Sequence, residues 1–120
     1  MKNFRFEDFT IWQESIKIAD LLFDIADIAS SKKFYRFAEQ LRGAALSISN
    51  NIAEGSSSFS DKDFANYLVI ARKSIFECAN ILTIFERRNL IENKIREDLF
   101  SRLFIISSQI TNFRKTLLKI

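Results

Sequence analysis

The stretch that decides the fold is residues 40–55, QLRGAALSISNNIAEG. Leu41, Ala45, Ile48 and Ile52 recur three and four residues apart, which is the spacing of a buried helical stripe. A second row runs beside the stripe and mixes small with polar residues: Gln40, Ala44, Ser47, Asn51 and Glu54. Such a row allows another helix to approach closely, provided that its polar groups find hydrogen-bond partners.

We expect this polar row to join polar residues of a later helix in a network that fixes helix register. The predicted members are Gln40, Ser47, Asn51, Glu54, Ser74 and Glu77. Arg42 and Arg72 are the candidate donors to Glu54 and Glu77, and Glu77 is expected to be buried. Gly55 follows the last residue of the pattern, where it is expected to supply a left-handed cap.

The composition favours helices throughout. The 120 residues include no proline and only two glycines, so the chain has few of the residues that form the many turns of a β fold. Periodicity predicts helices at about 10–29, 34–54, 61–88 and 92–118. The third carries an unbroken apolar heptad series: Phe64, Leu68, Ala71, Ile75, Cys78, Leu82 and Phe85. The first carries two apolar seams, which indicates either a second chain or a widened core.

Four helices of similar length with short connections predict one all-α domain over residues 1–120, an antiparallel up-down-up-down four-helix bundle. No uninterrupted apolar run reaches the roughly 18 residues of a membrane span. The first residues, MKNFRFEDF, become charged too early for a secretory signal. We therefore expect a cytoplasmic protein without a membrane partner.

Catalysis is disfavoured by the residue types present. Histidine is absent, which removes the commonest general base and metal ligand, and the single Cys78 falls on an apolar stripe. No metal site, cofactor or catalytic residue is predicted. Glu54 and Glu77 are the only carboxylates considered for acid–base chemistry, and a structural role for them is favoured.

Positive charge gathers in the second half of the chain. The net charge is +3, with seven basic and eight acidic residues in 1–60 but eleven and seven in 61–120. Cations near a C-terminal helix end also stabilise the helix dipole, so a solvated basic face is the simpler interpretation. The alternative is a surface for polyanions. Its candidate residues are Arg36, Arg42, Lys73, Arg87, Arg88, Arg102, Arg114 and Lys115. Base stacking is not expected, because the aromatic residues fall mostly on the seams.

Three segments together resemble one family: FEDFTIWQES at 6–15, the stretch at 40–55, and YLVIARKSIFE at 67–77. They are similar to the four-helix bundle proteins related to the bacterial 23S rRNA intervening-sequence proteins. The matching positions are Phe6, Asp8, Trp12, Gln13, Gln40, Leu41, Ala44, Ala45, Ser47, Ile48, Asn51, Ile52, Ala53, Glu54, Gly55, Leu68, Ile70, Ala71, Ser74 and Glu77. Three positions depart from the pattern: Gly43 replaces a frequent basic residue, Ser49 a proline and Lys73 a glycine.

The resemblance implies a homopentamer of four-helix bundles arranged as a barrel. A similar protein, the accessory variability determinant of diversity-generating retroelements, binds a reverse transcriptase and nucleic acid through basic surfaces. We therefore expect a non-catalytic oligomer that binds RNA or DNA and is associated with ribosomal RNA intervening sequences. The alternative is a protein–protein adaptor, for example for a reverse transcriptase or a ribosomal component.

Overall fold

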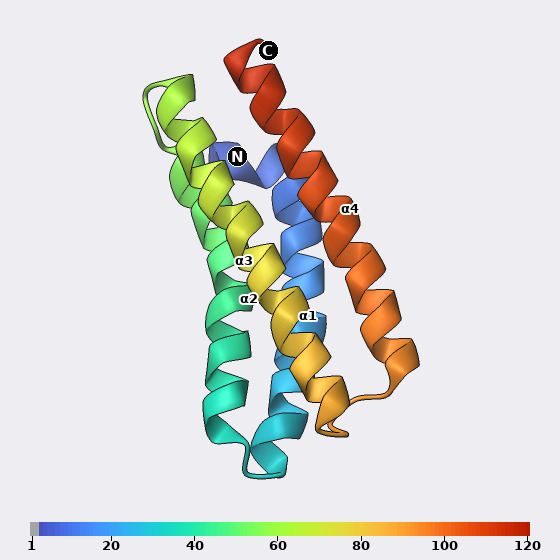
Figure 1. Ribbon diagram of the computed structural model, residues 1–120. Helices are drawn as coiled ribbons and strands as arrows, with labels where there is room; N and C mark the ends of the chain where they lie inside the picture. Colours follow the sequence, from blue (N-terminus) through green and yellow to red (C-terminus); the bar gives the residue numbers. More distant parts are fainter. Residues whose placement is uncertain (1–2) are drawn as a thin grey trace.

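The computed structural model describes residues 3–120 as four long helices joined by short turns (Figure 1). Its elements are the 3-10 turn η1 (Arg5–Asp8), α1 (Thr10–Ser31), α2 (Tyr35–Ser56), α3 (Asp61–Arg87) and α4 (Asn93–Leu118). Consecutive helices run in opposite directions, in an elongated body of 44 × 30 × 22 Å. The all-α class and the four helices are confirmed, and residues 3–120 contain no strand.

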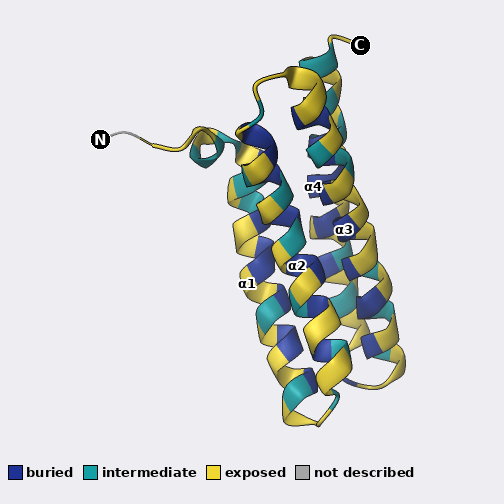
Figure 2. Cartoon of the chain, turned by 90° about the vertical axis from the view of Figure 1, so that its left-hand side faces the viewer, coloured by how far each residue is buried: buried dark blue, intermediate teal, exposed yellow. Residues whose placement is uncertain are grey.

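The core runs the full length of the bundle. All seven residues of the predicted α3 heptad series are buried, and the buried stripe of each helix faces its neighbours (Figure 2). From α4 the core takes Leu99, Leu103, Ile106 and Ile110, while Ile95 is partly exposed near the start of the helix. Within residues 3–120, no helix combines the length and the hydropathy that a bilayer span requires.

The ends of α1 and α3 share one local geometry. Lys33 and Asn89 adopt left-handed conformations, with φ of 70° and 59°. In each case the following backbone N–H reaches back five residues to a carbonyl, as in a Schellman motif: Phe34 to Ala29 and Leu90 to Phe85, both at 2.9 Å. Asn89 thus supplies the left-handed cap of α3, and both helices stop sharply at the same end of the bundle (Figure 1).

Gly55 does not act as the predicted cap. Helix α2 continues through Ser56, and the φ of Gly55 is not positive. The glycine is required for space: a Cβ at this position would lie 2.7 Å from Tyr67 Cβ and 2.8 Å from Phe64 Cδ1. The absence of a side chain thus lets α2 and α3 meet closely near the turn that joins them.

Three residues of the predicted polar network lie on the α2–α3 interface and are hydrogen-bonded in a chain. The Ser74 hydroxyl donates to the Ile70 carbonyl oxygen at 3.1 Å, so its single proton is occupied. The Ser47 hydroxyl therefore donates to Ser74 Oγ at 2.8 Å. Ser47 Oγ in turn accepts from Asn51 Nδ2 at 3.0 Å. One consistent direction of donation runs from α2 to α3.

The other predicted members of the network lie outside it. Gln40, Glu54 and Glu77 are exposed, so the prediction that Glu77 is buried is wrong. The two candidate donors are engaged elsewhere. Arg42 binds acids on α1 and α2, and the Arg72 guanidinium lies 4.7 Å from the centre of the Phe76 ring. The helical spacing of the predicted polar residues was correct, but Gln40, Glu54 and Glu77 lie beyond the edge of the α2–α3 interface and face solvent.

Replacement of the two glycines by alanine is expected to have opposite effects on stability. Alanine favours a helix over glycine by about 1 kcal/mol. No atom lies within 4 Å of a Cβ at Gly43, so Gly43→Ala should raise the free energy of unfolding by about 0.5–1 kcal/mol. Gly55→Ala should lower it by about 1–2 kcal/mol, because Tyr67 Cβ is fixed to the α3 backbone and the helices must separate. Urea unfolding of both variants checks this, and equal stabilisation of both would contradict the close approach.

Candidate nucleic-acid interface

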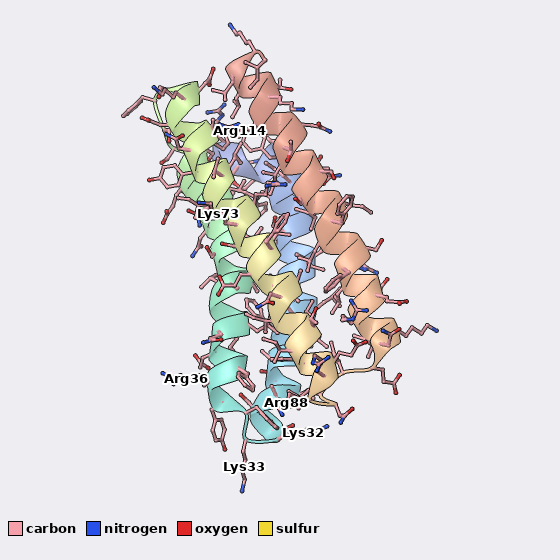
Figure 3. The ribbon with its side chains drawn as sticks, viewed as in Figure 1. Lys32, Lys33, Arg36, Lys73, Arg88 and Arg114 are labelled. Carbon is pink, nitrogen blue, oxygen red and sulfur yellow. The ribbon has the colours of Figure 1, made fainter. Side chains whose placement is uncertain are left out.

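The eight cations predicted to bind nucleic acid do not form one surface. The structure brings three of them to the end of the bundle that holds the α1–α2 and α3–α4 turns: Arg36, Arg87 and Arg88 (Figure 3). Three others lie elsewhere. Lys73 is within α3, and Arg114 is near the end of α4 at the opposite end of the bundle (Figure 3), where Lys115 follows it in the sequence.

Two of the predicted cations are already paired with acids. Arg42 binds Asp27 at 2.8 Å and Glu39 at 2.7 Å. The hydrogen bond to Asp27 is the main cause that raises the pKa of this guanidinium above its ordinary value, with Glu39 adding to it. Arg102 binds Asp98 at 3.1 Å, one turn earlier on α4. Their charges are largely balanced within the chain, so both contribute little to a surface for anions.

Two lysines that sequence analysis did not single out complete the first group. Lys32 and Lys33 occupy the turn after α1, at the same end of the bundle as Arg88, which follows the last residue of α3 (Figure 3). Lys32 and Asn89 line the same hollow of about 620 Å³, which places the two turns against each other. We call the five cations the basic end: Lys32, Lys33, Arg36, Arg87 and Arg88. None of the five forms an ion pair with any acid of residues 3–120.

The signal for this grouping was present in the sequence. A basic pair stands at the predicted end of both the first and the third helix, KK at 32–33 and RR at 87–88. In an up-down-up-down bundle these two helices end on the same side. The topology alone could therefore have joined the two pairs.

Helix stability explains four of the five cations but not the fifth. Lys32, Lys33, Arg87 and Arg88 are at or beside helix C-termini, where positive charge is favoured by the helix dipole. Arg36 is the second residue of α2, and the first turn of α2 contains no acid. A cation is disfavoured at a helix N-terminus by the same dipole. The position of Arg36 therefore opposes local helix stability.

Two acidic residues at this end line the same hollow as Lys32. Glu86 accepts from Asn93 Nδ2 at 2.6 Å and pairs with Arg96 at 3.0 Å. The Asn93 hydrogen bond is the main cause that lowers the pKa of this carboxyl, and Arg96 lowers it further. Glu86 and the exposed Glu92 both line the hollow. A polyanion is therefore better placed across the outer rim than inside the hollow.

The residues considered for other chemistry are placed as follows. Cys78 is buried in the core as predicted, and burial raises the pKa of its thiol to about 12. Glu54 and Glu77 are exposed to solvent. Among residues 3–120, no group of three His, Cys, Asp or Glu side chains is arranged to hold a metal ion.

Comparisons with known proteins agree with the resemblance seen in the sequence. The model of the 23S rRNA-intervening sequence protein family matches residues 7–112. The chain is also similar to a crystal structure of a protein of unknown function from the S23 ribosomal protein family of Bacteroides thetaiotaomicron. The two share 22% identity with a TM-score of 0.83, over 88% of this chain and 99% of that one. At this identity the likeness shows the fold alone. No match was found among curated proteins.

Proposed function

The chain belongs to the 23S rRNA-intervening sequence protein family, and from this premise we propose that it is a non-catalytic, oligomeric protein that binds the phosphate backbone of RNA or DNA through the basic end. The proposed setting is the ribosomal RNA intervening sequence that gives the family its name. The proposal includes no catalytic activity and no cofactor.

The observation that carries the proposal is the set of five unpaired cations gathered from two distant parts of the chain. Lysine and arginine side chains that no acid of residues 3–120 neutralises are available to phosphates. Arg36 adds a second argument, because its place in the first turn of α2 costs helix stability. A residue kept against a local preference is typical of a functional site.

Assembly into a homopentamer is the second part of the proposal. It is supported by apolar surface that the single chain leaves uncovered. Phe76 and Phe104 are 56% and 73% exposed and line a groove of about 210 Å³ between α3 and α4. Leu21 and Ile95 line another of about 340 Å³ between α1 and α4. Exposed apolar patches of this kind mark interaction surfaces.

The two grooves differ in their residues and lie on opposite sides of α4, between α4 and either of its neighbours. A contact between two unlike surfaces is heterologous, and repetition of such a contact closes a ring when the rotation permits it. Five chains of charge +3 would present a multivalent basic assembly with a total charge of +15. Multivalent attachment raises the overall affinity for a polymer well above that of one site.

A protein adaptor, for a reverse transcriptase or a ribosomal component, is the competing function. The exposed apolar surface favours this function as well, because the α3–α4 groove is lined by apolar side chains apart from Ser107 and fits apolar side chains of a partner. Co-purification with a candidate partner by a wild type that stays monomeric would favour the adaptor over self-assembly.

Neutralisation of the basic end should weaken nucleic-acid binding selectively. The test variant replaces Lys32, Arg36 and Arg88 by glutamine, and the matched control replaces Lys73, Arg114 and Lys115. Binding of a fluorescent RNA is followed by anisotropy across a salt series. Because each phosphate contact contributes about 0.7 to the salt slope on a single strand, the test variant should lower the slope by about two. The control should retain the wild-type slope, and absence of binding at low salt by the wild type would refute the proposal.

The uncovered apolar surface should govern the oligomeric state. Analytical ultracentrifugation of the wild type should give about 70 kDa, five times the 14.0 kDa chain. Phe104→Glu should dissociate the assembly, because a charge in a buried interface lacks a partner. Phe59→Glu is the control, since Phe59 is fully exposed on the α2–α3 loop. A monomeric wild type at tens of micromolar would contradict this part of the proposal.

A further inference from the structure

One aromatic side chain is exposed among the cations of the basic end. Tyr35 is 61% exposed and stands between Lys33 and Arg36 in the sequence. We propose that the basic end takes single-stranded nucleic acid, with an unpaired base stacked on the Tyr35 ring and the flanking phosphates bound by the cations. This inference rests on the proposed function and adds the class of ligand to it.

The aromatic residues on either side of Tyr35 fix its direction. Phe34 and Phe37 stack on each other with centroids 5.8 Å apart, and Phe37 packs toward Phe85 of α3 at 6.4 Å. These two residues turn inward and anchor the start of α2. Helical geometry then turns the intervening Tyr35 and Arg36 away from the core. The tyrosine is thus held outward by its neighbours.

The turn that carries Tyr35 is well ordered by hydrogen bonds. Lys33 N–H donates to the Ser30 carbonyl oxygen and Phe34 N–H to that of Ala29, both at 2.9 Å. Ala38 N–H donates to the Phe34 carbonyl oxygen at 3.0 Å. These bonds fix the backbone that carries the ring, so binding of a flat partner has to order only the side-chain torsions of the tyrosine.

The fold supplies no role for the exposed ring. Tyr35 makes neither a hydrogen bond through its hydroxyl nor an aromatic contact with any of residues 3–120. The expectation that bases would not stack came from aromatic residues lying on the seams. Tyr35 is an exception, because it follows the inward-facing Phe34 by one residue and is itself exposed.

An exposed ring beside cations favours a single strand over a duplex. In a duplex the faces of the bases are covered by their neighbours, so only the phosphates would meet the basic end. An unpaired base offers its face, and stacking on an aromatic side chain with cations along the backbone is the common mode of single-strand binding. Phe59 provides the contrast: it is even more exposed than Tyr35 but precedes the acids Asp61 and Asp63, which repel phosphates.

The experiment compares three probes of equal length by fluorescence anisotropy: a single-stranded oligonucleotide, its abasic sugar–phosphate counterpart, and its duplex. The wild type should bind the single strand about five- to tenfold more tightly than the abasic probe. Tyr35→Ala should remove this preference and leave the abasic affinity and the salt slope unchanged. Tyr35→Phe should keep the preference, because it keeps the ring, and Phe59→Ala should have no effect.

The outcomes separate the two proposals. The stacking proposal would be overturned if all three probes bound equally and Tyr35→Ala left their affinities unchanged. It would also be overturned if the duplex bound more tightly than the single strand. In both cases polyanion binding would stand. Absence of binding by every probe would instead refute the proposed function. Since Tyr35 is exposed, thermal unfolding of Tyr35→Ala should match the wild type, which confirms that any loss of affinity is local.

Discussion

The close contact between α2 and α3 at Gly55 is the constraint on which the rest of the bundle depends. Phe64 and Tyr67 occupy the space that a side chain at Gly55 would need. Two turns earlier on α2, the Ser47–Ser74 hydrogen bond fixes the register of the same pair of helices. With α2 and α3 held together, α1 and α4 pack along their sides, and the α1–α2 and α3–α4 turns meet at one end (Figure 1). The basic end is a consequence of this packing.

Periodicity predicted the helices and the core well, because burial in a bundle is dictated by helical spacing. The α3 series from Phe64 to Phe85 is buried at every position. The errors concern residues whose roles depend on a neighbouring helix. Gly55 matched the pattern of a cap, yet its role is set by Tyr67, twelve residues away. Glu77 shares the spacing of Ser74 but lies past the edge of the interface, which spacing alone does not show.

The candidate interface was predicted only in part for a related reason. Charge counts along the chain do not distinguish Arg42, which two acids neutralise, from Arg36, which is unpaired within residues 3–120. They also overlooked Lys32 and Lys33, which lie in the half of the chain that is acidic on balance. Proximity to Arg87 and Arg88 arises from the topology and not from the local sequence. The two helix ends where the chain reverses therefore hold the cations of the candidate interface.

The central claim is that nucleic acid contacts the end of the bundle formed by the turns after α1 and α3. Photo-crosslinking of a 4-thiouridine RNA to the wild-type protein, with the crosslinked residues identified by mass spectrometry, tests it most directly. Crosslinks are expected within residues 32–36 and 87–89. Crosslinks confined to the opposite end, around Arg114 and Lys115, would contradict it.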